Sequence, residues 1–321
     1  MKPFAFVFPG QGSQSVGMLD AWGDHPAVRE VLQEASAALG EDIGELIRSG
    51  PKEALALTTN TQPVMLVAGL AAYRVWLAET GLVPAAVAGH SLGEYSALVA
   101  AGVLTLSQAA PLVRFRAQAM QDAVPVGAGA MAAILGMEAA KVTAGCAGVM
   151  AEFGENSPEV VEAVNFNDPL QTVIAGSKAA VEKACEVLKA NGAKRALPLP
   201  VSAPFHSSLM RPAAERLRER LASLAFLPPQ IPLVNNVDVM VEVEAGRIRD
   251  ALYRQAFGPV RWVECVRALG ARGLSSVVEC GPGKVLAGLV KRINPEMNGL
   301  ALLDPTSLAV VKSELLSNHH E

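Results

Sequence analysis

The sequence has few aromatic, cysteine and charged residues, and these shortages exclude several classes of protein. Its 321 residues include three tryptophans, three tyrosines and four cysteines, and only 18% are charged. The cysteines form no CxxC pair and have no metal-site spacing, so we expect free thiols in a reducing compartment and no bound metal. A net charge of −4 excludes the uniformly basic surface of a general nucleic-acid-binding protein.

Long hydrophobic runs are missing as well. The first apolar run, Phe4–Phe8, stops at Pro9-Gly10 and is too short for the core of a secretory signal. The longest apolar stretches, such as 63–73, cannot cross a bilayer. We therefore expect a cytoplasmic protein with no membrane partner. Because 51% of the residues are hydrophobic, the chain can still bury a large core.

Short apolar runs alternate with helical patterns, which is typical of an α/β protein. The predicted strands outside the middle of the chain are Phe4–Phe8, 84–89 and Ser276–Cys280, and a hairpin is predicted at 233–242. The predicted helices are 27–39, 62–80, 92–101, a helical segment at 113–116, 212–224, 249–256 and one after Gly281-Pro282-Gly283.

The middle of the chain has a pattern of its own. It predicts strands at 131–135, 162–166, 171–175 and 194–199 and helices at 137–146 and 178–191. This β-α-β-β-α-β order is that of a ferredoxin-like fold. We therefore predict a small ferredoxin-like subdomain at 127–198, inserted into a large α/β domain formed by 1–126 and 199–321.

The pentapeptide Gly-His-Ser-Leu-Gly at 89–93 lies between a predicted strand and a predicted helix. In this context G-x-S-x-G indicates a nucleophile elbow, in which a sharp turn exposes Ser91 and aims the Leu92 N–H at a developing oxyanion. The alternative is a glycine-rich turn with a capping serine. The flanking elements favour the nucleophile.

A serine nucleophile needs a base, and histidine is the usual one. His319 and His320 lie in a polar C-terminal segment, His25 lies in a polar turn, and His90 adjoins the serine, where it can brace the turn. His206 remains, in a loop just after the predicted insertion. Taken alone it is a half-buried loop histidine, but beside an elbow without another base it is the candidate base.

No acidic residue can be assigned as the third member of a triad. Glu152, Glu155 and Asp168 lie in or beside the predicted insertion, and the sequence does not place any of them against His206. A carbonyl oxygen could orient the imidazole instead, because the third group only has to hold the ring tautomer.

Several segments together resemble malonyl-CoA:acyl carrier protein transacylases. The run FPGQGSQ at 8–14 and the run GHSLGEY at 89–95 are similar to that family's signature segments. Further matches are Arg116 with Met120-Gln121, Phe205-His206, NNV at 235–237, Gln255 and ECGPGKVL at 279–286. The resemblance covers nearly the whole chain. It implies an α/β-hydrolase-like core with a mostly parallel sheet and a ferredoxin-like insertion.

The resemblance also implies roles for residues in this chain. Ser91 would be the nucleophile, His206 the base and acid, and Gln11 and Leu92 the oxyanion donors. Arg116 would bind the malonyl carboxylate, and an oxygen of Gln255 would hold the imidazole. Further pocket residues implied by the resemblance are Met120, Phe205, Asn165 and Asn167. Arg114, two residues before Arg116, is expected to form a surface salt bridge.

The resulting expectation is an acyltransferase that moves malonyl from malonyl-CoA to the phosphopantetheine thiol of an acyl carrier protein. Coenzyme A thioester is then the substrate, and no cofactor is expected. A serine hydrolase or thioesterase shares the elbow, and a non-catalytic scaffold shares the fold, so both remain as alternatives. An acidic carrier would need basic docking residues, for which the candidates are Lys194, Arg195, Arg211, Lys284, Lys291 and Arg292.

Overall fold

The computed structural model describes residues 2–201 and 203–317, so His319 and His320 lie outside the described residues. The described strands are β1 (Phe4–Phe8), β2 (Ala86–Gly89), β3 (Gly129–Leu135), β4 (Val161–Asp168), β5 (Gln171–Ser177), β6 (Arg195–Pro198), β7 (Leu233–Val234), β8 (Ser276–Cys280) and β9 (Asn298–Leu302). The helices are α1 (Pro26–Leu39), α2 (Ile43–Ser49), α3 (Lys52–Ala56), α4 (Thr58–Thr80), α5 (Gly93–Ala100), α6 (Leu106–Asp122), α7 (Ala139–Phe153), α8 (Lys178–Ala190), α9 (Arg211–Ala222), α10 (Ala245–Phe257), α11 (Trp262–Ala271), α12 (Val285–Ile293) and α13 (Pro305–Leu316).

A five-stranded sheet in the order β7-β2-β1-β8-β9 forms the centre of the larger part of the molecule. Its pairings are all parallel. Every residue of β1, β2 and β8 is buried, as expected when helices cover both faces of a parallel sheet. Phe8 pairs with Gly89, so the carboxyl ends of β1 and β2 lie side by side. Ligands bind at that edge in open α/β sheets.

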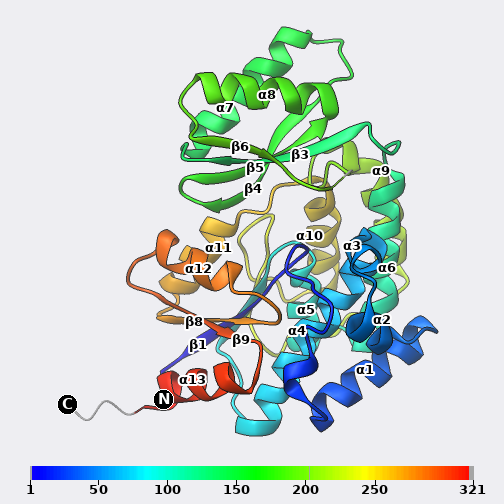
Figure 1. Ribbon diagram of the computed structural model, residues 1–321, viewed down its shortest axis with the longest axis vertical. Helices are drawn as coiled ribbons and strands as arrows, with labels where there is room; N and C mark the ends of the chain where they lie inside the picture. Colours follow the sequence, from blue (N-terminus) through cyan, green and yellow to red (C-terminus); the bar gives the residue numbers. More distant parts are fainter. Residues whose placement is uncertain (1, 202, 318–321) are drawn as a thin grey trace.

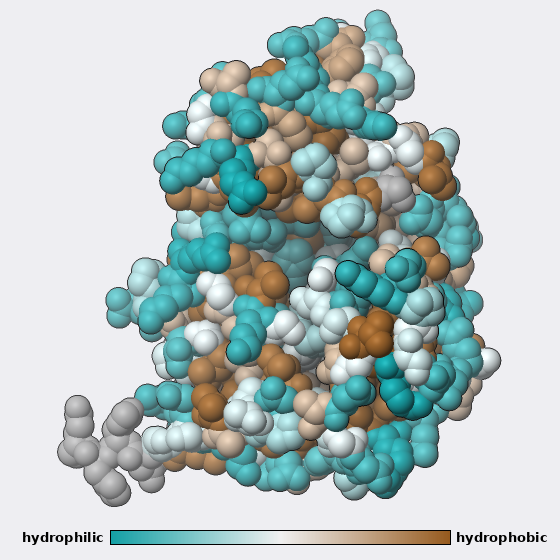
Figure 2. Space-filling view, in the orientation of Figure 1, coloured by the Kyte–Doolittle hydropathy of each residue, from teal (hydrophilic) through white to brown (hydrophobic). Residues whose placement is uncertain are grey.

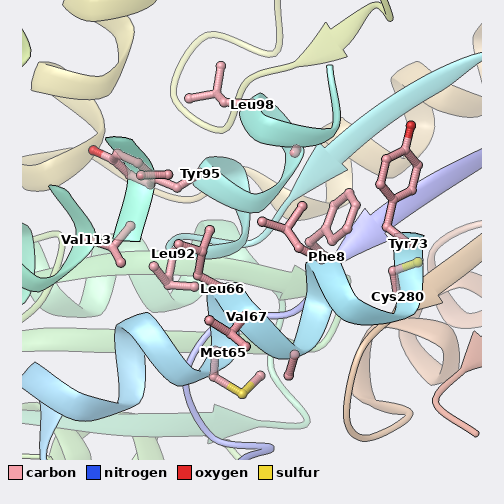
Figure 3. Packing of buried hydrophobic residues seen from close by; sticks show 14 of the residues in the cluster. Phe8, Met65, Leu66, Val67, Tyr73, Leu92, Tyr95, Leu98, Val113 and Cys280 are labelled. Atoms are coloured by element: carbon pink, nitrogen blue, oxygen red, sulfur yellow. The ribbon is translucent and has the colours of Figure 1, made fainter. Parts of the chain in front are cut away.

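The core between the sheet and its helices is built around α4. Figure 3 shows Met65, Leu66 and Val67 of this helix in the same cluster as Leu92 and Phe8. Toward the amino end of β1, Trp76 of α4 packs edge-on against Phe4 and Phe6, with ring centroids 5.6 Å apart in both pairs. These contacts fix the strand that precedes the Gln11 loop and the turn that carries Ser91.

Residues 129–198 form a second, antiparallel sheet in the order β4-β5-β3-β6, with α7 and α8 packed on one face (Figure 1). The strand order and the β-α-β-β-α-β connectivity confirm the ferredoxin-like prediction. Its other face lies toward the parallel sheet (Figure 1). The domain boundaries at 126/127 and 198/199 stay a prediction.

Hydrogen bonds at β4 join the small sheet to the larger part of the molecule, at Val260 in the segment between α10 and α11. The Phe166 N–H donates to the Val260 carbonyl at 3.0 Å, and the Val260 N–H donates to the Val164 carbonyl at 2.8 Å. Asp168, at the end of β4, pairs with Arg292 of α12 at 3.1 Å. The register of β4 against β5 shifts twice between Ala163 and Asp168, which frees this stretch of β4 to bond the larger part.

The predicted hairpin at 233–242 is present only as a short antiparallel return, in which the Asn235 N–H donates to the Met240 carbonyl at 3.0 Å. Leu233 and Val234 form a two-residue strand parallel to β2, and only one antiparallel bridge joins Val234 to Val241. The chain leaves the sheet because Asn235 forms a turn, in which its side-chain oxygen accepts the Asp238 N–H at 2.9 Å. Helices α2, α3, α11 and α13 and strand β9 were not predicted. Among the described residues, no helix is both long enough and apolar enough to cross a membrane.

Candidate active site

Ser91 lies on the tight turn between β2 and α5 and has a φ of 53°, a left-handed conformation that is costly for a non-glycine residue. The flanking glycines make the turn possible. A Cβ on Gly89 would lie 1.9 Å from the Gly93 carbonyl carbon, and a Cβ on Gly93 would lie 2.0 Å from the Phe8 carbonyl oxygen. The strand and the helix can therefore pass closely only without side chains at both positions, as the G-x-S-x-G pattern predicts.

The Ser91 Oγ lies 2.6 Å from the Nε2 of His206, although 115 residues separate them in the chain. His206 also has a left-handed φ, of 66°, in the loop that returns from the insertion. Its Nδ1 lies 2.8 Å from the backbone carbonyl of Gln255. A carbonyl can only accept, so Nδ1 carries the proton and Nε2 is free to accept from the serine hydroxyl.

The backbone carbonyl of Gln255 takes the position of a triad acid. Glu152 and Glu155 are exposed on the small subdomain, and Asp168 is paired with Arg292. Burial, followed by the nearby positive charge of Arg116, lowers the pKa of His206 to about 3. The imidazole is therefore neutral at physiological pH, which is the form a general base needs.

Two backbone N–H groups at the pocket are available for an oxyanion. Gln11, after β1, and Leu92, after the serine, both line the cavity that contains Ser91. In the described part of the chain neither N–H donates to another group. The N–H of Ser91 itself is not available, because it donates to the Asn236 Oδ1 at 2.8 Å.

Arg116 points inward from α6 and is 1% exposed. Its guanidinium donates to the Gln62 Oε1 at 2.8 Å, to the Gln255 Oε1 at 3.0 Å and to the Ser91 Oγ at 3.3 Å. Arg114, two residues earlier, faces the other way and forms an ion pair with Glu41 at 2.5 Å. This difference confirms that the two arginines face apart, because neighbours two apart on a helix do not share a face.

The remaining predicted residues divide into two groups. Met120, Phe205 and Asn165 line an open pocket of about 120 Å³ together with Ser91, His206 and Arg116. Asn167 is not among the residues that line it. It lies 2.7 Å from the Nε2 of His90, whose ring is 5.5 Å from that of Trp262. His90 therefore braces the elbow against the small subdomain, as expected. Figure 2 shows a hollow in the surface between the two parts.

Comparison with known proteins gives this arrangement a family. The model of the acyl transferase domain matches residues 5–299. The malonyl CoA-acyl carrier protein transacylase of Escherichia coli is 52% identical over 310 residues, which is 96% of this chain and 98% of that protein. The chain belongs to this family.

Solved structures of transacylases have the same fold. An acyl-carrier-protein S-malonyltransferase from Burkholderia pseudomallei has a TM-score of 0.93 at 61% identity, covering 97% of this chain and 99% of that one. A malonyl-transacylase solved in complex with its type II PKS acyl-carrier protein has a TM-score of 0.93 at 47% identity, covering 99% and 100%. The fold class predicted from the sequence is confirmed.

The roles predicted from the sequence omit three residues of this transacylase site. Gln62 holds Arg116, Asn236 holds the Ser91 N–H, and Glu94 is a buried carboxyl that binds both Asn236 and Gln255. Burial raises the pKa of Glu94, whereas the Asn236 N–H, the charge of Arg116 and the Gln255 amide lower it by favouring the ionised form. Asn236 and Glu94 lie in segments that match the family, but the sequence match alone does not show which groups their side chains bind.

Proposed function

We propose that this chain transfers malonyl from malonyl-CoA to the phosphopantetheine thiol of an acyl carrier protein through an acyl-enzyme at Ser91. Membership of the transacylase family supports the overall reaction. The observation that carries the proposed mechanism is the convergence on one atom: the Ser91 Oγ lies 2.6 Å from the His206 Nε2 and 3.3 Å from the Arg116 guanidinium. The base and the carboxylate-binding group thus both adjoin the nucleophile.

The first half of the reaction forms the ester. His206 takes the hydroxyl proton as the Ser91 Oγ attacks the thioester carbonyl, and the oxyanion accepts the N–H groups of Gln11 and Leu92. The C–S bond then breaks, and the departing sulfur takes the proton from His206. Arg116 holds the free carboxylate of the malonyl group with a planar pair of donors, which a lysine could not offer.

The second half returns the enzyme to its starting state. His206 takes the proton of the carrier's thiol, the sulfur attacks the Ser91 ester, and the serine oxygen leaves with the proton from His206. The steps are a ping-pong sequence that needs no cofactor, since coenzyme A thioester is a substrate. Phe205, at the pocket wall, would crowd a methyl group on the α-carbon. Rejection of one methyl is worth about 1–3 kcal/mol, so Phe205 favours malonyl over its branched analogue.

We place the reaction in the cytoplasm and in fatty-acid or polyketide synthesis. The four cysteines of the chain are free, and free thiols persist in a reducing compartment. The relatives include a malonyl-transacylase solved with a type II PKS acyl-carrier protein, so both pathways are consistent with the family. Comparing transfer rates to a fatty-acid carrier and to a polyketide carrier decides between them.

Intact mass spectrometry tests the proposed acyl-enzyme. Brief incubation of the wild-type chain with malonyl-CoA should add one malonyl group, which peptide mapping should place on Ser91. Ser91→Ala should take up none. An unlabelled wild-type protein, or equal labelling of the variant, would refute the mechanism. Accumulation of free malonate at the same rate with and without carrier would favour the hydrolase alternative.

A further inference from the structure

A carboxyl group lies buried behind the elbow, and the reaction steps above do not use it. Glu94, in the first turn of α5, is 1% exposed. Its Oε1 accepts the backbone N–H of Asn236 at 2.6 Å, and its Oε2 accepts the Nε2 of Gln255 at 3.0 Å. Burial alone favours the protonated form, but the two donors, one on each oxygen, favour the carboxylate, because the O–H of a protonated carboxyl group would face one of these donors.

Gln255 connects this carboxylate to Arg116. The Nε2 of its amide donates to Glu94 and to the Ser91 carbonyl, while its Oε1 accepts from Arg116 at 3.0 Å. The NH₂ group of the Gln255 amide can only donate and its oxygen can only accept. Because the NH₂ group faces the acceptors on Glu94 and Ser91, the oxygen points to the opposite side. The oxygen faces Arg116, which has only donors to offer. The hydrogen-bond polarity therefore runs in one direction from Glu94 to the guanidinium.

The indirect connection leaves the arginine open to a ligand. In the described part of the chain, no carboxylate lies within ion-pair distance of the buried Arg116. A direct glutamate partner would occupy the donors that a malonyl carboxylate needs. One amide between the two charges lets Glu94 favour the charged arginine from a distance, and the face toward the pocket remains available. The Nε of Arg116 likewise has no partner among the described residues.

We propose that Glu94 is a positioning residue for malonyl recognition, which acts through the Gln255 amide to hold Arg116 in its carboxylate-binding orientation. The proposal rests on the function proposed above and names the device that supports its acyl specificity. It assigns Glu94 no proton transfer and no contact with substrate.

The substitution Glu94→Gln separates this role from simple packing, because it keeps the size of the side chain and changes only its polarity. The amide introduced at position 94 has one acceptor for two donors. Its oxygen keeps the short bond to the Asn236 backbone, and its NH₂ group then faces the Nε2 of Gln255, donor against donor. Because two donors repel each other, the Gln255 amide turns or moves away, and Arg116 loses the Gln255 Oε1 as its acceptor.

The experiment compares kcat/KM for malonyl-CoA and acetyl-CoA in the wild-type chain and in Glu94→Gln. The malonyl-to-acetyl ratio should fall about tenfold or more, the cost of one charge-assisted hydrogen bond, mainly through a higher KM for malonyl-CoA. Glu242→Gln is the matched control. Glu242 lines the same small cavity as Glu94 and its nearest charged partner is Arg247, 3.8 Å away, so this variant should keep the wild-type ratio.

A second variant keeps the test decisive if Glu94→Gln does not fold. Gln255→Leu removes the amide and leaves the backbone carbonyl that holds His206, and it should lower the ratio by a similar factor. Combining the two substitutions should lower it no further, because both break one relay. Equal losses for malonyl and acetyl in either variant, an unchanged ratio, or multiplied effects in the double variant would overturn the proposal.

The failure of this proposal differs from the failure of the proposed function. If the wild-type chain does not take up malonyl on Ser91, the proposed function itself fails. If the wild-type chain is labelled and the ratio does not respond to Glu94→Gln or Gln255→Leu, only the role of Glu94 is wrong.

Discussion

Replacement of Arg116 should change the choice of acyl group more than the rate of acyl transfer. Acetyl-CoA differs from malonyl-CoA by the free carboxylate that Arg116 is proposed to bind. The guanidinium is 1% exposed and already held by Gln62 and Gln255, so little ordering is needed when the carboxylate arrives. In Arg116→Ala that carboxylate would enter the pocket without its partner.

The magnitude follows from the burial of the group. Removal of one partner of a buried ion pair costs about 3–5 kcal/mol, and the lower end applies here because the pocket is open to solvent. About 3 kcal/mol corresponds to roughly a hundredfold loss in kcat/KM for malonyl-CoA. Acetyl transfer should fall much less. Arg116→Lys should lie between the two, since it keeps a charge without the planar pair of donors.

A transfer assay with both thioesters and a fixed concentration of carrier measures these losses. Arg114→Ala is the control within the same helix, because that side chain faces away and pairs with Glu41. It should retain wild-type selectivity. If Arg116→Ala lost malonyl and acetyl transfer equally, Arg116 would have no carboxylate-binding role.

Two further predictions concern pH. Because burial and Arg116 lower the pKa of His206 to about 3, the imidazole stays neutral down to pH 5, and single-turnover acylation of Ser91 should lack the roughly thirtyfold loss that an ordinary imidazole would cause by that pH. A stopped-flow profile with an inflection near 6.5 would contradict this. Burial raises the pKa of Glu279 from 4.5 to about 7. The stability that this group contributes is therefore fully present below pH 4.5 and is lost as the pH rises through 7, and the loss amounts to at most about 3 kcal/mol. Urea unfolding at several pH values should show a smaller decline in Glu279→Gln than in the wild type, and identical slopes would refute the assignment.

The sequence predicts the parts of this molecule that depend on local chemistry. The elbow can be recognised because only glycine fits at positions 89 and 93, where the strand, the turn and the helix pass within contact distance. The insertion can be recognised because its apolar runs keep strand and helix spacing in a familiar order. His206 follows by elimination, since a serine nucleophile needs a base and the other histidines are poorly placed.

The network beneath the elbow could not be predicted in the same way. Asn236 is 145 residues from Ser91, and Gln255 is 161 residues from Glu94. Amide side chains follow no periodic pattern, so neither their burial nor their direction can be read from the sequence. The sequence does not place strand β7 in the parallel sheet, because its two residues are too few to carry an alternation. Its parallel pairing with β2 depends on a contact across the fold.

The most direct test of the account is a chase of the isolated acyl-enzyme. The wild-type chain is labelled with malonyl-CoA, freed of coenzyme A, and mixed with a stoichiometric amount of carrier protein that bears phosphopantetheine. If Ser91 carries the acyl group between the two thiols, the malonyl mass should leave the enzyme and appear on the carrier in one turnover. Label that stays on the enzyme, or is released only as free malonate, would contradict the acyl-enzyme mechanism.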